Sequence, residues 1–216
     1  MFIIEYCPDS SGNSSGQLGG GAYLAELNQW PRNGYNVTMT PFLTIRASLF
    51  PTSYLPQKSC ITVFLPYSID RYTIKDIRSC TLNDQSQVKE FHGGAGKVVF
   101  HEENSAEIKP AEIETFPSFP LISREMTPLE ASEDLEDEIS GLYGSKLLGR
   151  PSWIQDEIFM PEKYFFALQI IEADIVKLDK RYEGIFNDGA LYLYLRQSLK
   201  KSNHGDVVGE VFIQFT

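Results

Sequence analysis

The chain has 216 residues and a formal net charge of −10 at pH 7, from 19 Lys and Arg against 29 Asp and Glu. This acidity argues against nucleic acid and against an anionic membrane surface as partners, since both attract basic surfaces. The length is sufficient to bury a sizeable core without a metal or disulfides, so we expect no cofactor.

No stretch approaches the ~20 apolar residues that a membrane-spanning helix needs. The short apolar run that begins at Met1 is interrupted by Glu5, and it lacks the basic residues that begin a secretory signal. We therefore expect a cytoplasmic protein. Its cysteines are odd in number and lack Cys-x-x-Cys spacing, which predicts reduced thiols rather than a disulfide framework or a zinc site; they are Cys7, Cys60 and Cys80.

The same predicted elements recur in the same order in both halves of the chain. The first copy comprises 17–24 (QLGGGAYL), Trp30-Pro31, 41–45 (PFLTI), 60–65 (CITVFL) and 96–99 (GKVV). The second comprises 146–153 (KLLGRPSW), 164–170 (YFFALQI), 190–195 (ALYLYL) and 205–208 (GDVV). This recurrence predicts an internal duplication. Matching apolar alternation predicts that the strands superpose, with Leu43, Ile45, Val63 and Leu65 in the places of Leu168, Ile170, Leu191 and Leu193.

Between the copies, prolines at 110, 117, 120 and 128 predict neither continuous helix nor central strand, and 116–120 (FPSFP) is expected to run extended over the surface. A helix is predicted over 129–139, with Thr127 as N-cap, Pro128 in the first turn and Glu130 completing a capping box. Leu135 and Ile139 form its narrow apolar seam. We expect a solvated helix lying on the fold.

The strands of the second copy alternate with period two, as half-buried strands do. Phe166, Leu168 and Ile170 are predicted to share one face, leucines and tyrosines alternate in 190–196, and 211–215 (VFIQF) follows the same pattern. The segment 187–189 (NDG) predicts a tight turn with positive φ before the 190–196 strand.

Together these elements predict an α+β fold that is internally duplicated, with predominantly antiparallel β-sheets and a few short helices. The expected organisation is a first repeat half over residues 1–106, a Pro-rich and acidic connector over 107–140, and a second repeat half over 141–216, joined in one compact domain.

Catalytic and metal-binding motifs give little support to an enzyme. The run 91–98 (FHGGAGKV) lacks the first glycine and the Ser or Thr of a phosphate loop, and indicates a turn before a strand at 97–100. The histidines at 92, 101 and 204 lack the spacing of metal ligands on one helix face. Cys60 opens an apolar strand, where a free cysteine usually acts as a small hydrophobe; a nucleophile beside a histidine is the alternative. We therefore expect neither catalytic residues nor a metal site.

The acidic run 125–138 lacks the spacing of a calcium loop and is typical of a solvated helix face, with recruitment of a basic partner or a divalent cation as the alternative.

Trp30 and Trp153 occupy matching places in the two copies, which favours core aromatics holding a loop, or side chains that line a binding groove. Gln155 and Gln169 are polar residues in the second copy. Gln169 is predicted either to hydrogen-bond loop backbone near Trp153 or to present its amide to a ligand.

These segments resemble the YwqG-like family of bacterial proteins of unknown function. The resemblance is carried in the first half by 17–20 (QLGG), Trp30-Pro31 and 42–45 (FLTI). In the second half it is carried by 146–155 (KLLGRPSWIQ), 167–170 (ALQI) and 189–195 (GALYLYL). It implies a duplicated α+β architecture with antiparallel sheets and no established activity.

We expect a non-enzymatic protein-interaction module of the bacterial cytoplasm, of the kind that accompanies toxin and immunity systems. Its partner is expected to be a protein. The alternative is a hydrolase or small-ligand-binding enzyme with a cleft between the two repeats. Two convergent titratable residues in such a cleft would favour the enzyme, and an open acidic face would favour the binding module.

Overall fold

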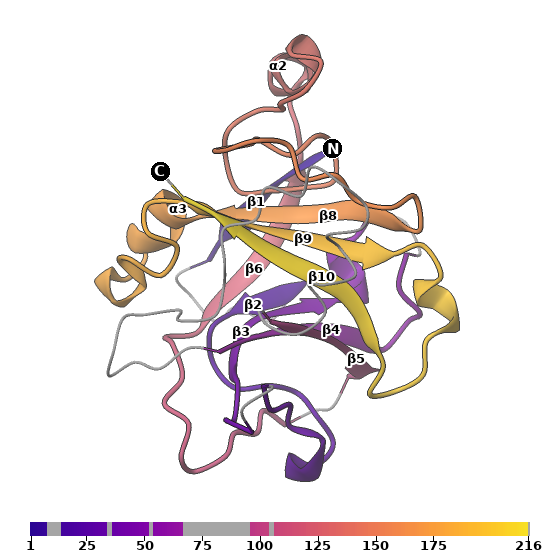
Figure 1. Cartoon of the computed structure of the whole chain (residues 1–216), viewed down its shortest axis with the longest axis vertical. Helices are drawn as coiled ribbons and strands as arrows, with labels where there is room; N and C mark the ends of the chain where they lie inside the picture. The colour runs from indigo at the N-terminus through magenta and orange to yellow at the C-terminus, as the bar shows by residue number, and fades with distance from the viewer. Residues whose placement is uncertain (8–13, 34–35, 52–53, 67–95, 104–105, 216) are drawn as a thin grey trace.

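The strands pair into one closed antiparallel barrel in the computed structural model, which describes residues 1–7, 14–33, 36–51, 54–66, 96–103 and 106–215 (Figure 1). The order around the barrel is β1 (Phe2–Tyr6), β6 (Phe119–Glu125), β2 (Gly16–Leu18), β3 (Thr40–Arg46), β4 (Ser59–Leu65), β5 (Lys97–Glu102), β10 (Val207–Gln214), β9 (Ala190–Arg196), β8 (Tyr164–Ile171) and β7 (Lys146–Leu147). β7 pairs in turn with β1, which closes the sheet.

Helices contribute little to the described part of the chain. The α-helices there are α2 (Pro128–Glu136) and α3 (Glu172–Val176), and single 3₁₀ turns occur at Leu27–Gln29, Ala47–Leu49, Lys180–Tyr182 and Leu199–Lys201. None of the described helices is long and apolar enough to cross a membrane. The predicted antiparallel β-structure with a few short helices is confirmed, and the fold is mostly β.

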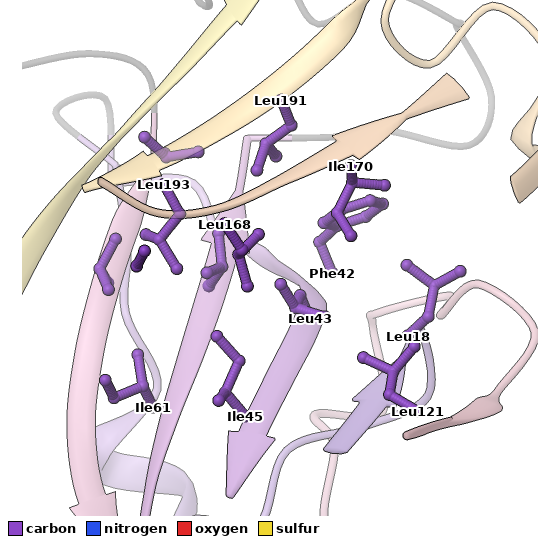
Figure 2. Close-up of a cluster of buried hydrophobic side chains, with 14 of the residues drawn as sticks. Leu18, Phe42, Leu43, Ile45, Ile61, Leu121, Leu168, Ile170, Leu191 and Leu193 are labelled. Atoms are coloured by element: carbon purple, nitrogen blue, oxygen red, sulfur yellow. The ribbon is translucent and has the colours of Figure 1, made fainter. Parts of the chain in front are cut away.

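The barrel interior is filled by the inward-facing residues of alternating strands. Figure 2 shows Leu43, Ile45, Leu168 and Leu193 from both halves of the chain pointing into one apolar core. In β9 the leucines face this core, while Tyr192 and its neighbouring tyrosine belong to a second cluster outside the barrel. The predicted alternation of β9 is therefore confirmed, and so is that of β10.

A bulge changes the alternation in β8. The register shifts between Phe166 and Leu168, so Ala167 and Leu168 both face the core, whereas Phe166 packs in the outer cluster. The prediction that Phe166 shares a face with Leu168 is wrong because one extra residue reverses the side-chain direction. β3 has a register shift between Pro41 and Leu43 at the corresponding point of its pairing.

The registers of β3–β4 and β8–β9 correspond, with one difference from the prediction. Leu43 lies opposite Val63 as Leu168 lies opposite Leu193. Val63 therefore stands in the place of Leu193, and not of Leu191 as predicted. A shift of two residues keeps every apolar side chain on the same face, so the alternation could not distinguish the two registers.

The connections after β2 and β7 have the same unusual backbone. Gly19 and Gly20 have φ of 65° and 72°, and Leu148 and Gly149 have φ of 59° and 86°. The amide of Gly19 donates to the carbonyl oxygen of Phe42 at 2.7 Å, and that of Leu148 to Ala167 at 2.9 Å. The predicted positive-φ turn before β9 is also present, at Asn187 and Asp188.

β6 begins in the segment 116–120, which was predicted to run extended over the surface, and continues through the predicted connector. It pairs with β1 along residues 121–125 and with β2 along residues 119–121, so it is an internal strand of the barrel. The prediction of no central strand between the copies is wrong. Pro120 is tolerated because its carbonyl still accepts a hydrogen bond, from the amide of Cys7 at 2.9 Å.

Candidate functional site

α2 begins as predicted. The hydroxyl of Thr127 accepts from the amide of Glu130 at 3.3 Å, and the Glu130 carboxylate accepts from the amide of Thr127 at 2.8 Å. This reciprocal pair satisfies two of the amides that a helix N-terminus leaves without partners. The guanidinium of Arg124 forms two hydrogen bonds with the same carboxylate. Together these contacts lower the pKa of Glu130, Arg124 being the main cause, to about 2.

The inward residue of α2 is an acid rather than a leucine. Asp134 is fully buried, while Leu135 and Ile139 are 53% and 62% exposed. The predicted apolar seam of this helix, Leu135 and Ile139, is therefore exposed and does not pack against the fold. The helix ends at Glu136, so Ile139 lies beyond it in the chain that leads to β7.

Asp134 is held by a buried polar network. Its carboxylate forms an ion pair with the ammonium of Lys146, and neither side chain is exposed. One carboxylate oxygen also accepts from the amide of Leu142 at 2.9 Å, and the other from the amide of Arg150 at 3.1 Å. Lys146 in addition donates to the carbonyl oxygen of Leu142 at 2.7 Å. Burial lowers the pKa of Lys146, and the Asp134 carboxylate opposes this shift.

This network fixes which side of α2 faces outward. Removing two charges from water offsets much of their attraction, so a buried pair specifies an arrangement more than it adds stability. Arg150 reinforces the arrangement at the C-terminal end of the helix, where its guanidinium donates to the carbonyl oxygens of Leu135 and Asp137. Cations there also interact favourably with the helix dipole.

Four large apolar residues are consequently exposed on α2 and the segment after it. We call them the α2 surface: Leu129 (69% exposed), Leu135, Ile139 and Tyr143 (59% exposed). Figure 1 shows α2 at one end of the molecule, beyond the strands of the barrel. Single exposed apolar residues are ordinary, but several on one short segment are typical of an interaction site.

A second candidate lies on the outer face of β4 and β5. Cys60 lies directly opposite His101 across the strand pair, so the combination of thiol and imidazole required by a cysteine nucleophile is present in the register. Both residues are fully buried. The hydrogen bonds of His101 decide whether this pair could be reactive.

His101 uses both ring nitrogens for other contacts. Nδ1 lies 2.9 Å from the carbonyl oxygen of Glu102, which can only accept, so Nδ1 carries the proton. Nε2 therefore accepts from the hydroxyl of Thr62 at 2.8 Å, and the hydroxyl of Thr44 donates to Thr62 at 3.0 Å. Burial lowers the pKa of His101, which keeps the ring neutral.

The Cys60 thiol is not activated. Burial, with a further contribution from the Glu103 carboxylate, raises its pKa to about 12 against a smaller opposing effect of Arg46. Arg46 is itself engaged, in an ion pair with Glu103 at 2.7 Å. A nucleophilic cysteine needs a lowered pKa and a free base beside it, so this pair fits a structural role. No three His, Cys, Asp or Glu side chains converge as a metal site would require within the residues that the structure describes.

The two tryptophans lie in two separate apolar clusters on the outside of the barrel. Trp30 is 7% exposed, donates its indole N–H to the carbonyl oxygen of Met39 at 2.7 Å and packs edge-on against Phe64. Trp153 is half-buried and packs against Tyr192, with ring centroids 5.0 Å apart. These contacts are those of side chains that hold a loop against the sheet.

The two glutamines contact backbone groups. Gln169 is fully buried; its amide oxygen accepts from the amide of Ser152 at 2.7 Å, and its amide nitrogen donates to the carbonyl oxygen of Gly144 at 2.7 Å. Gln155 is exposed and donates to the carbonyl oxygen of Phe215 at 2.8 Å. Gln169 thus bridges two loops near Trp153, as its structural interpretation predicted.

Sequence reasoning missed the residues that orient the α2 surface. Asp134 was one acid among many in the run 125–138, and Lys146 stands twelve residues later at the start of a two-residue strand. The polar outer face of β5 had a signal in the sequence: His101 directly follows Phe100, and successive residues of a strand point to opposite faces of the sheet. Cys80, His92 and the glycine-rich run 91–95 lie outside the described residues. Comparison of the chain with models of known protein families and with curated proteins gave no match.

Proposed function

We propose that the protein is a non-enzymatic protein-interaction module of the bacterial cytoplasm that binds its partner through the α2 surface. The observation that carries the proposal is the reversal of α2, whose inward residue is the charged Asp134 while Leu135 faces outward, as does Ile139 in the segment that follows. A helix that served only the fold would bury its leucines, since that burial is the main source of helix stability in proteins. The buried ion pair instead holds the leucines at the surface, where they can pack against a partner protein.

The alternative, a hydrolase or small-ligand-binding enzyme with a cleft between the repeats, receives less support. Cys60 and His101 are adjacent, but the thiol stays protonated and the imidazole is committed to Thr62. The inner faces of the two halves share one core, in which Leu43 and Leu168 lie together (Figure 2). Apolar side chains thus occupy the space between the inner faces.

We further propose that the barrel arose by internal duplication. β2–β5 and β7–β10 are two four-stranded arrays that meet where β5 pairs with β10. Both have a register shift at the same point, and both have two positive-φ residues after the first strand. A carboxylate accepts from the residue that follows each such turn: Glu107 from the amide of Gly21, and Asp134 from that of Arg150. The resemblance to the YwqG-like family and the link to toxin and immunity systems remain predictions.

Site-specific photo-crosslinking tests the proposed function. A photoreactive phenylalanine analogue is placed at Leu135 in the full chain, in cells that naturally produce the protein. The control places it at Gln197, an exposed residue on the connection after β9. We expect a discrete protein adduct from position 135 that Ile139→Ser weakens and that position 197 does not form. Equal adducts from both positions, or none from position 135, would contradict the proposal.

A further inference from the structure

The α2 surface combines its apolar residues with exposed carboxylates. Glu133, Glu136 and Glu138 are exposed, and within the described chain no Lys or Arg forms an ion pair with any of them. Two of them belong to the same helix as Leu129 and Leu135, and the third directly precedes Ile139. The α2 surface therefore presents apolar side chains and carboxylates side by side along the sequence.

The bases nearest in sequence are already engaged. Arg124 pairs with Glu5 and Glu130, at 2.9 Å and 2.7 Å. Lys146 is buried with Asp134, and the Arg150 guanidinium donates to the carbonyl oxygens at the end of α2. None of these cations is free to neutralise the outer acids.

From this charge pattern we propose that the occupant of the α2 surface is a basic amphipathic segment of a partner protein, with apolar side chains set between Lys or Arg residues. This inference rests on the proposed function. Apolar anchors would pack against Leu135 and Ile139, and flanking cations would meet Glu133, Glu136 and Glu138, as in the docking of an amphipathic helix onto an apolar face.

The same charges disfavour the other occupants. An anionic lipid surface or a nucleic acid would bring phosphates against three exposed carboxylates, which repel them. A second copy of this chain, docking the same surface on itself, would bring like charges together. An uncharged apolar segment could pack on the leucines but would leave the acids partly desolvated and unpaired.

Binding of synthetic probes tests the inference. The first probe is an amphipathic peptide of about 14 residues of Leu and Lys, long enough for a helix to be marginally stable. The second has Glu in place of every Lys. Binding of each labelled probe to the full chain is measured by fluorescence anisotropy at about 0.05 M and about 0.5 M salt, because salt screens exposed charges beyond a few ångströms at the higher concentration.

Three variants separate charge from apolar contact. The first is Glu133→Gln with Glu136→Gln and Glu138→Gln, and the second is Leu135→Ser with Ile139→Ser. The matched control replaces three exposed acids outside the acidic run: Glu114→Gln, Glu162→Gln and Glu183→Gln. We expect the Lys probe to bind at least tenfold more weakly to each of the first two variants and at high salt, to bind the control as it binds the unmodified chain, and the Glu probe not to bind.

The outcomes distinguish the two proposals. If the apolar variant weakens binding but the three Gln substitutions do not, or if both probes bind alike, the partner is not basic and this inference fails while the proposed function stands. If the control variant weakens binding as much as the first, attraction to the net charge explains it and the inference also fails. If the Leu135→Ser and Ile139→Ser pair affects neither the probe nor the photo-crosslinked adduct, the proposed function itself fails.

Discussion

Gln169 is a buried amide whose two ends are both satisfied by backbone. It connects Ser152 to Gly144, and so joins the loop that carries Trp153 to the segment before β7. A buried polar side chain of this kind is stabilising only while its partners are present, because each partner left alone loses its hydrogen bond without regaining water. Residues near Trp153 therefore depend on it for their position.

Replacing Gln169 by Leu should lower the free energy of unfolding by about 1–3 kcal/mol, since it leaves the Ser152 amide and the Gly144 carbonyl unsatisfied. Gln155→Leu, at an exposed residue, should change it by less than about 0.5 kcal/mol. Urea denaturation of both variants measures the difference. Equal stability of the Gln169 variant and the unmodified chain would contradict the bridging role and favour an amide that serves a ligand.

His101 makes stability depend on pH. Burial lowers the pKa of His101 below the ordinary value of 6.5, the bond to the Glu102 carbonyl opposes this, and the nearby His204 ring adds a smaller lowering effect. The unfolded chain then binds a proton at a higher pH than the folded chain does. Stability is therefore fully present above about pH 6.5 and is lost as the pH falls below it.

The expected result is a steeper fall in melting temperature between about pH 7 and pH 5 for the unmodified chain than for His101→Gln. His204→Gln should retain most of the fall, since it removes only the smaller contribution of the exposed His204 ring, which accepts a hydrogen bond from the amide of Glu102, and leaves the buried imidazole in place. Parallel pH profiles for the unmodified chain and His101→Gln would show that the buried ring does not contribute.

At the scale of elements, α2 is held by charge where most surface helices are held by apolar burial. The Asp134–Lys146 pair joins the helix to β7, and the backbone amides of Leu142 and Arg150 complete the shell around the carboxylate. Breaking such a pair leaves one charge buried alone, which is far less favourable than either the pair or its neutral replacement.

Lys146→Met should therefore lower the free energy of unfolding by about 3–5 kcal/mol. Adding Asp134→Asn should recover part of this loss, because Asn carries no charge and its oxygen can still accept from the Leu142 amide. Lys177→Met is the matched control, since Lys177 is 73% exposed in its ion pair with Asp174 and its loss should cost at most about 1 kcal/mol. Denaturation midpoints that place Lys146→Met beside Lys177→Met would contradict the buried pair.

What could be predicted from the sequence depended on how local each signal is. The start of α2 is encoded in four consecutive residues from Thr127 to Glu130, and it was predicted correctly. Its orientation depends on Lys146, which is remote in the chain and unremarkable in the sequence. The alternation of β9 can be predicted from the spacing of its leucines, whereas the one-residue bulge in β8 leaves no signal in the sequence. Pro120 lacks a backbone N–H and therefore predicted an interruption, but β6 continues through it because the strand pairs with β1 and β2 on its two sides.

At the scale of the whole molecule, the barrel is closed by its N-terminal strand. β1 pairs with β6 on one side and with β7 on the other, so its loss would leave two unpaired edges. Ile4 is the residue of β1 that is buried in the barrel core, and Ile3 is half-buried on the opposite side of the strand.

Ile4→Ala should lower the free energy of unfolding by about 2–5 kcal/mol, the range for removing a buried aliphatic side chain. Ile3→Ala should have a clearly smaller effect, since part of that side chain is already in water. Guanidinium denaturation followed by circular dichroism compares the two. Equal losses would mean that β1 does not present alternate faces to the core, and no loss from either would mean that the strand does not close the barrel.

Closure also determines when the chain can fold. β1 ends at Tyr6, whereas its partners begin at Phe119 and Lys146. At a synthesis rate of about 5–20 residues per second, β1 leaves the ribosome on the order of ten seconds before β6 exists to receive it. During that interval both edges of an apolar strand are open to other nascent chains. Glu5, the single charge within β1, later pairs with Arg124, and until then it acts as a gatekeeper against aggregation.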